Sequence, residues 1–386
     1  MDLDESPRAD GLRTSQLTRF YEGRTVLVTG SSGFKGSWLS LWLTLLGAQV
    51  CGFSLPVPDD RPSHFDLLRL TLTSRQVFGD VRDAQCVLDA VERWRPSIIF
   101  HLAAQPTVAE SIKAPSHTFA VNVLGTAHVL DAAREVESVE SVVCVTSDKC
   151  YMDQNWVWGY RETDALGGRD PYSASKAAAE FVIEAFRSSV LPHCGRNDMA
   201  VASARAGNVI GGGDWAHDRL IPDIIRWAYL GSPLSLRNPA STRPWQHVLE
   251  ALSGYLWLGV LLSRDPGTYS TSWNFGPHYD RRVTAEELLN EMARRLDRDP
   301  QCNVKTPKAL QQHETMNLRL DSHKSFHLMD WRTTWSLGEA LDFTAQWYSR
   351  YYKDTGAAGT MRAETESQIR AYCGQARTAG AAWAAE

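Results

Sequence analysis

The sequence predicts an α/β protein built on a doubly wound parallel sheet, with a smaller C-terminal lobe. Short β-branched runs alternate with helical segments through the first half of the chain, which is typical of a parallel sheet covered by helices on both faces. A glycine-rich turn joins the first of these strands to the first helix. After residue 200 the alternation breaks up, yet no linker separates a second module. We therefore expect a Rossmann-type sheet with a lobe woven onto it.

The composition is that of an ordinary globular chain. Of 386 residues, 43% are hydrophobic and 22% charged, and the net charge is −5, so nucleic acid is not an expected partner. The first twenty residues lack an apolar signal core, and no run approaches the roughly 20 apolar residues that span a bilayer. Seven cysteines without a C-x-x-C pair favour reduced thiols, a cytoplasmic location and no metal site.

The first βα unit carries the strongest local signal. A buried strand over Thr25–Thr29 runs into the loop 30–36, a helix over 37–46 and a second strand over 49–53. In such a turn the first glycine makes the tight bend, the middle one admits a pyrophosphate, and the last lets helix and sheet pack closely. The helix N-terminus then faces the phosphates. This pattern predicts NAD bound at the loop, held by Gly30, Gly33, Phe34 and Gly36.

The second strand ends without the acid that usually binds the ribose hydroxyls of NAD. It also lacks an arginine for the 2′-phosphate of NADP. Asp59 and Arg61 are the nearest candidates beyond Ser54. We expect NAD rather than NADP.

The alternation continues with strands at 77–83, 97–104, 141–146 and 200–205, and with helices at 84–93 and 122–135. A further helix begins at 220, a late strand covers 273–277, and an amphipathic helix ends at 352. Ligands of a parallel sheet bind beyond the carboxyl ends of its strands. Gly30, Asp80, His101 and Thr146 should therefore meet in one cleft.

Tyr172 and Lys176 are four residues apart in a segment of helical character that follows Pro171. A proline suits the first turn of a helix, and the spacing places both side chains on one face. An ammonium beside a phenol lowers the phenol pKa from about 10 toward neutrality. A tyrosine tuned in this way can take a proton from a hydroxyl while hydride leaves the same carbon.

Several motifs together resemble the NAD-dependent epimerase/dehydratase family of the extended short-chain dehydrogenase/reductase superfamily. They are Thr29-Gly30-x-x-Gly33-Phe34-x-Gly36, Asp80-x-Arg82-Asp83, His101-Leu102-Ala103-Ala104-Gln105, Thr146-Ser147-Asp148 and Tyr172-x-x-x-Lys176. Longer stretches resemble, more narrowly, the CDP-glucose 4,6-dehydratases; they lie at 33–39, 147–151, 156–162, 205–215 and 243–248. The resemblance extends from residue 24 to about residue 350.

The resemblance implies a hydro-lyase of deoxysugar and polysaccharide biosynthesis that converts CDP-D-glucose to CDP-4-dehydro-6-deoxy-D-glucose. Hydride leaves C4 for NAD, water is lost across C5 and C6, and the hydride returns to C6. Other enzymes on this scaffold remain as alternatives, namely another nucleotide-sugar 4,6-dehydratase, a 4-epimerase or a reductase. A non-catalytic NAD-binding scaffold is a more remote one. An epimerase would not need the pair Asp148 and Lys149.

The same resemblance implies roles for the catalytic residues. Tyr172 is the general base at the 4-hydroxyl, Lys176 lowers its pKa and can bond the nicotinamide ribose, and Thr146 offers a hydroxyl to the same oxygen. Asp148 is the expected proton donor to the departing hydroxyl. Lys149 replaces the Glu of dTDP-glucose dehydratases and is either a partly neutral base or a group that only orients others.

Other residues are assigned by their place in the motifs. Cofactor contacts are expected from Asp80, Val81, Ala103, Ala104 and Gln105. Substrate contacts are expected from Asn208, Leu220, Arg237, Arg243 and His247, because arginine forks suit pyrophosphate oxygens. Trp245 is a candidate for the base pocket. His101 is expected to support its turn, and Lys35 to lie on the surface of the first helix.

The resemblance also suggests the organisation of the chain. Residues 1–22 form a polar N-terminal extension, 23–200 mainly the NAD-binding domain, 201–352 mainly an interwoven nucleotide-sugar-binding lobe, and 353–386 a loosely ordered tail. Segments 122–134 and 173–186 resemble the helix pair of a four-helix dimer interface. A homodimer or a dimer of dimers is therefore expected.

Overall fold

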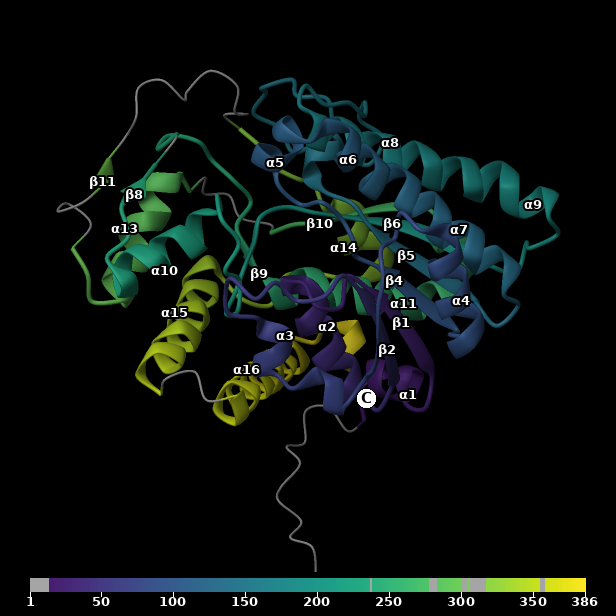
Figure 1. Cartoon of the computed structure of the whole chain (residues 1–386), viewed down its shortest axis with the longest axis horizontal. Helices are drawn as coiled ribbons and strands as arrows, with labels where there is room; N and C mark the ends of the chain where they lie inside the picture. The colour runs from purple at the N-terminus through teal and green to yellow at the C-terminus, as the bar shows by residue number, and fades with distance from the viewer. Residues whose placement is uncertain (1–13, 237, 278–282, 300–303, 306–316, 355–357) are drawn as a thin grey trace, which may run out of the picture.

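A seven-stranded parallel sheet organises the chain (Figure 1). The computed structural model describes residues 14–236, 238–277, 283–299, 304–305, 317–354 and 358–386. The strands are β1 (Thr25–Thr29), β2 (Gln49–Ser54), β3 (Arg75–Phe78), β4 (Ile98–His101), β5 (Ser141–Val145), β6 (Ala200–Ala206) and β10 (Ser272–Phe275). Their spatial order is β10-β6-β5-β4-β1-β2-β3, with every pair parallel. The order reverses direction between β1 and β4, which is where such sheets bind ligands.

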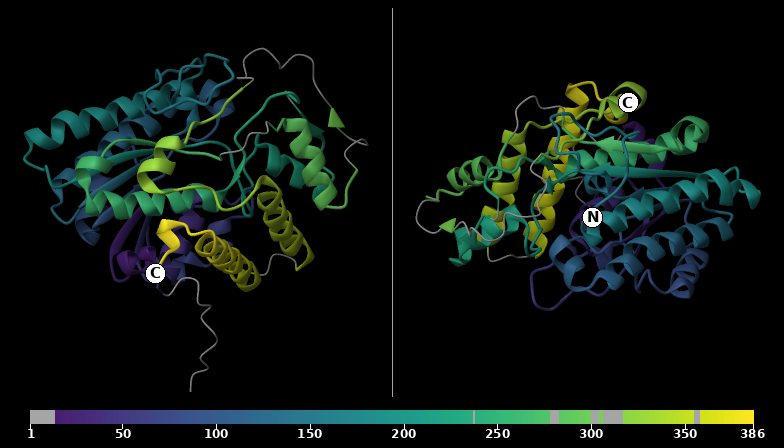
Figure 2. Two further views of the ribbon diagram at one scale, coloured as in Figure 1. Left: turned by 180° about the vertical axis from the view of Figure 1, so that it is seen from behind. Right: turned by 90° about the horizontal axis from the view of Figure 1, so that it is seen from above.

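Helices cover both faces of the sheet (Figure 2). One face packs against α2 (Phe34–Leu45) and α11 (Val248–Arg264), whose apolar side chains join the larger hydrophobic core. The other face packs against α4 (Ala84–Trp94), α7 (Gly125–Glu135) and α8 (Pro171–Ala185). The strands read as continuous apolar runs because both of their faces are buried.

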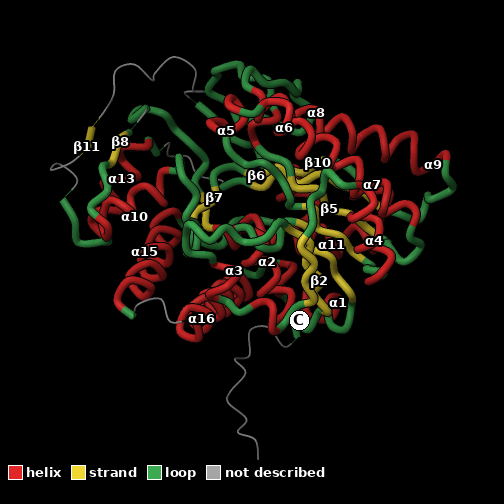
Figure 3. The backbone as a smooth tube through the Cα atoms, viewed as in Figure 1, coloured by secondary structure: helices red, strands yellow, loops and turns green. Residues whose placement is uncertain are grey.

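The C-terminal half contributes to both the sheet and a separate lobe. Helices α10 (Leu220–Leu230), α13 (Ala285–Arg295) and α15 (Leu337–Lys353) gather at one end of the molecule, on the left in Figure 3. The short pairs β8 (Leu234–Ser235) with β11 (Val304–Lys305), and β7 (Val209–Ile210) with β9 (Gln246–His247), belong to this half as well. Strand β10 and helix α11 complete the Rossmann sheet, so the two halves are interwoven.

The remaining elements are short except for the last helix. They are α1 (Gln16–Tyr21), α3 (His64–Leu67), α5 (Val108–Lys113), α6 (Pro115–Phe119), α9 (Leu191–His193), α12 (Pro266–Tyr269), α14 (His323–Met329) and α16 (Ala358–Thr378), with 3-10 or π turns at Leu70–Leu72, Ala120–Leu124, Asp148–Cys150, Phe186–Val190 and Ala382–Ala384. The predicted helix at 122–135 thus begins as a π turn. Across the described ranges, no helix is both long and apolar enough to cross a membrane.

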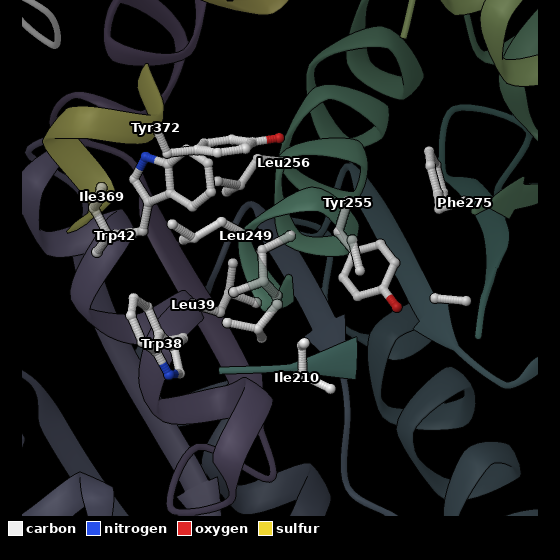
Figure 4. Packing of buried hydrophobic residues seen from close by; sticks show 14 of the residues in the cluster. Trp38, Leu39, Trp42, Ile210, Leu249, Tyr255, Leu256, Phe275, Ile369 and Tyr372 are labelled. Carbon is white, nitrogen blue, oxygen red and sulfur yellow. The ribbon is translucent and has the colours of Figure 1, made fainter. Parts of the chain in front are cut away.

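The prediction of a loosely ordered tail at 353–386 is wrong. Helix α16 packs against α2, and the side chains of Ile369 and Tyr372 are completely buried (Figure 4). Trp383 stacks on Tyr372, with ring centroids 5.6 Å apart, and meets Trp42 of α2 edge-on at 5.9 Å. The segment is rich in Ala, Thr and Gly, but its buried residues recur at helical spacing. The burial of that side against α2 stabilises the helix.

The N-terminal segment is also partly structured. Residues 1–13 of the predicted extension lie outside the described residues. Helix α1 buries Leu17 and Tyr21, and the Tyr21 hydroxyl donates to the Leu256 carbonyl of α11 at 2.7 Å. Beside it, the Gln16 amide donates to the Ala385 carbonyl at 2.9 Å. The two ends of the described chain therefore meet on the same side of the sheet.

Candidate active site

A cleft of about 990 Å³ opens at the carboxyl edge of the sheet and extends toward the lobe. The glycine loop, the ends of β4 and β5, the start of α8 and the loop after β6 line it, together with residues from α10. The motifs that the sequence placed at strand ends therefore do meet in one cavity.

The glycine loop is shaped for the close approach of a dinucleotide. Gly30 has φ +72°, and a Cβ there would lie 2.8 Å from the Ala103 amide nitrogen. A Cβ on Gly36 would lie 2.0 Å from the Gly30 carbonyl oxygen. Helix α2 begins at Phe34 without a side-chain cap, so its first amide groups are available to an anion. The loop therefore fits NAD.

The other predicted cofactor residues divide into two groups. Asp80, Val81, Ala103 and Ala104 line the cleft. A side-chain bond from Arg82 lowers the pKa of the Asp80 carboxyl.

Gln105 does not line the cleft, which corrects the prediction of a cofactor contact. It is buried and holds the turn instead: its side-chain amide exchanges hydrogen bonds with the Thr107 backbone, and its backbone amide donates to Asn122 Oδ1. His101 supports its turn as predicted, between Thr29 Oγ1 at 2.8 Å and Thr126 Oγ1 at 3.1 Å.

The predicted catalytic residues come from two neighbouring elements and all line the cleft. Thr146, Asp148 and Lys149 follow β5, which lies next to β4 in the sheet. Tyr172 and Lys176 lie on the first turns of α8, which Asp170 caps and Pro171 begins. Strand end and helix start thus face each other across the same cavity.

Lys176 is not among the main causes that shift the pKa of the Tyr172 phenol. Burial raises the pKa of the Tyr172 phenol to about 12, opposed by a hydrogen bond with the Ser147 side chain. Lys176 Nζ instead donates to the Val145 carbonyl at 3.4 Å, and burial lowers its pKa to about 8. Desolvation outweighs the short-range pairing that the four-residue spacing suggested.

Asp148 has the properties of a proton donor. Its side chain is buried, and desolvation raises the pKa of its carboxyl. Oδ1 accepts from Ser147 Oγ at 3.0 Å, whereas Oδ2 has no hydrogen-bond partner among the described residues. A carboxylic acid that keeps its proton in such a site can donate it to a departing hydroxyl.

Lys35 corrects another prediction, because it lines the cleft instead of the outer surface of α2. Its Nζ donates to the hydroxyl of Tyr255 at 3.3 Å, the tyrosine that α11 presents in Figure 4. Burial, followed by the nearby charges of Arg219 and Lys176, lowers the pKa of Lys35 to about 7. Sequence reasoning missed Lys35 and Arg219 because nothing local distinguishes them from surface cations.

Only some of the predicted substrate-binding residues line the cleft. Asn208, Leu220 and Arg243 line the cleft, as does Trp245. Arg237 lies outside the described residues.

His247 does not reach the cleft, contrary to the prediction. Its ring is completely buried between Trp38, at 5.7 Å, and Trp335, at 4.8 Å. Burial lowers its pKa to about 3, so it is a neutral core residue.

The fold and this cleft define an NAD-binding enzyme of the short-chain dehydrogenase/reductase type. A family model described as GDP-mannose 4,6 dehydratase matches residues 27–344. A CDP-glucose 4,6-dehydratase of Salmonella typhimurium is 43% identical over 336 residues, which cover 86% of this chain and 93% of the relative. The chain therefore belongs to the GDP-mannose 4,6-dehydratase family and is an NAD-dependent nucleotide-sugar 4,6-dehydratase, a hydro-lyase.

Solved structures share the fold. The dTDP-glucose 4,6-dehydratase DesIV of Streptomyces venezuelae, with NAD bound, superposes with a TM-score of 0.72 at 25% identity, covering 84% of this chain and 97% of that one. A UDP-glucose 4-epimerase of Thermotoga maritima shares the fold, with a TM-score of 0.70 at 20% identity, covering 86% and 99% of the two chains.

Proposed function

We propose that the substrate is CDP-D-glucose and the product CDP-4-dehydro-6-deoxy-D-glucose. The observation that carries this proposal is the 43% identity to the CDP-glucose enzyme. Relatives that act on UDP-glucose and dTDP-glucose reach only 26% and 23%, over 86% and 84% of the chain. The Asp148–Lys149 pair at the cleft supports the same choice, because the resemblance associates Asp-Lys with CDP-glucose enzymes and Asp-Glu with dTDP-glucose enzymes.

Oxidation at C4 is assigned to the end of the cleft where β5 and α8 meet. NAD, when bound at the glycine loop, supplies the hydride acceptor and a positively charged ring. Tyr172 takes the proton of the 4-hydroxyl, and Lys176 lies one turn further along α8 to bond the ribose. Because burial raises the pKa of the Tyr172 phenol to about 12, this tyrosine needs nearby positive charge to act as a base.

Elimination across C5 and C6 is assigned to the turn after β5. Asp148 gives its proton to the departing 6-hydroxyl, so that C–O cleavage releases water. Lys149 lines the cleft beside it. It either accepts the C5 proton as a base or only orients neighbouring groups. Asn208 and Arg243 line the same cleft and are assigned to the pyrophosphate of the substrate.

We also propose a homodimer that acts in the cytoplasm. Large apolar side chains are exposed on α5, α6, the following π turn and α8; they are Ile112, Phe119, Leu124 and Phe181. Exposed apolar side chains on neighbouring helices favour a self-complementary interface, although Ile112 also lines the cleft. Six cysteines within the described ranges are unpaired, which supports a reducing compartment.

The function is tested by mass spectrometry of purified protein incubated with NAD and, separately, CDP-, dTDP-, UDP- and GDP-glucose. We expect loss of one water from CDP-glucose alone, abolished by Tyr172→Phe and retained by Tyr269→Phe, a tyrosine outside the cleft. Water loss from another nucleotide sugar would overturn the substrate. An unchanged mass with a new sugar isomer would instead indicate epimerisation.

A further inference from the structure

Glu180 is a buried carboxylate that the mechanism above does not use. It lies on α8 one turn beyond Lys176, and its residue is 4% exposed. Thr146 Oγ1 donates a short hydrogen bond to Oε1 of this carboxylate. Ser203 Oγ and Arg205 Nη2 both donate to Oε2, each at 2.7 Å.

The environment keeps Glu180 ionised. Burial opposes ionisation, but the Arg205 guanidinium and the hydrogen bonds from Arg205, Thr146 and Ser203 hold the pKa of the carboxyl below its usual range. The two charged side chains are themselves only 3% and 4% exposed. An ionised carboxylate accepts hydrogen bonds and has no proton to give. The single hydroxyl proton of Thr146 therefore points at Glu180.

We propose that Glu180 is a positioning residue that fixes the direction of the Thr146 hydroxyl. With its proton committed to Glu180, Thr146 presents only lone pairs to the cleft. The 4-hydroxyl has a single proton, which it donates to Thr146 when the sugar binds and then passes to Tyr172 as hydride leaves C4. Once the oxygen has become a ketone, the newly protonated Tyr172 donates to it and Thr146 does not. This inference rests on the proposed function.

The same network reaches the elimination residues. Arg205 Nη1 donates to the Tyr151 hydroxyl at 2.8 Å and its guanidinium lies 5.0 Å from that ring. Tyr151 closes the short turn that carries Asp148, and its own hydroxyl donates to Asn274 Oδ1 on β10 at 2.7 Å. Glu180 thus connects the helix that carries Tyr172 to the turn that carries the acid.

The test compares Glu180→Gln with Ser203→Ala, a matched control that removes another hydrogen bond to the same carboxylate without touching the cleft. We expect kcat of Glu180→Gln to fall about 10- to 100-fold with an unchanged KM, because small misplacements of a reacting group cost up to about 100-fold. Ser203→Ala should keep the wild-type kcat within about twofold. Both variants should unfold at a lower temperature than the wild type.

A double-mutant cycle with Thr146→Val separates positioning from general structural damage. In the Thr146→Val background, Glu180→Gln should lower kcat no further, and the two changes should also be non-additive in thermal unfolding. Independent, multiplicative effects on kcat would overturn the proposal, as would a Glu180→Gln enzyme with wild-type kcat.

Should Glu180→Gln fail to fold, Glu180→Asp keeps the charge opposite Arg205 but withdraws it from Thr146. The same loss of kcat is then expected, and a fully active Glu180→Asp enzyme would refute the proposal. The unfolding cycle needs no substrate, so it can test the Glu180–Thr146 contact even if the proposed function is wrong. If the two changes are non-additive in unfolding but the wild type dehydrates no nucleotide sugar, only the proposed function is refuted.

Discussion

Glu250 provides a direct test of how the C-terminal segment is held. Its carboxylate, on α11, is completely buried and accepts the Thr334 amide at 2.9 Å, the Trp335 amide at 2.7 Å and the Tyr372 hydroxyl at 2.7 Å. Burial raises its pKa from 4.5 to about 7, despite these donors. The folded protein therefore holds a proton here at pH values where the unfolded chain has lost it.

The sign and size of the effect follow by linkage. A carboxyl whose folded pKa is raised contributes stability that is present below the unfolded pKa and declines as pH rises toward the folded pKa. The difference of about 2.5 pKa units corresponds to about 3.5 kcal/mol, at about 1.4 kcal/mol per unit. Unfolding should therefore become easier by about this amount between pH 4.5 and pH 7 on account of Glu250.

The assay is urea unfolding of the wild type and Glu250→Gln at several pH values from 5 to 8. The wild-type advantage over Glu250→Gln should shrink by about 2 to 3 kcal/mol as pH rises, because glutamine does not titrate. Comparing the two proteins cancels the titration of other carboxyls, and Glu137→Gln, an exposed position, is the matched control. A difference that stays constant across this range would refute the reasoning.

Three further predictions concern the loop, the acid and the last helix. Gly36→Ala should weaken NAD binding at least about 10-fold in a fluorescence titration, because a 2.0 Å approach to the Gly30 carbonyl must be relieved; Gly374→Ala, with open space around it, should bind normally, and equal affinities would contradict this. Asp148→Asn should slow water loss by about 10²- to 10⁴-fold, so that quenched single turnovers contain the unreacted 4-keto hexose; rapid dehydration would exclude Asp148 as the acid. Deleting residues 358–386 should lower the unfolding temperature sharply or make the protein insoluble, because it uncovers Trp42; an unchanged unfolding temperature would show that α16 is dispensable.

Much of the fold could be predicted because its signals are local. The strand over Thr25–Thr29 and the glycine loop after it are readable from neighbouring residues, and Tyr172 and Lys176 report their shared helix face by spacing. The tail helix α16 could not be predicted from its composition, which is polar on average, and its buried side includes Thr365 and Gln368 beside Ile369 and Tyr372. Periodicity, not composition, was the informative property there.

What could not be predicted depends on residues that are distant in the sequence. Glu180 stands four residues after Lys176, yet its partners Thr146 and Arg205 lie 34 and 25 residues away. The orientation of Lys35 depends on Tyr255, which is 220 residues further along. The raised pKa of Tyr172 reflects its burial by many segments at once. The spacing of Tyr172 and Lys176 in the sequence does not reveal how deeply Tyr172 is buried.

The packing of Trp383 on Tyr372 and Trp42 has a consequence for biosynthesis of the chain. Trp42 of helix α2, which follows the cofactor loop, is synthesised long before Trp383, its partner in the fold. The apolar face of α2 therefore stays incompletely covered until residue 383 has been synthesised. The nucleotide-binding unit cannot reach its final packing as an early, independent folding step, and a nascent chain stalled before residue 358 should still expose Trp42 to chaperones.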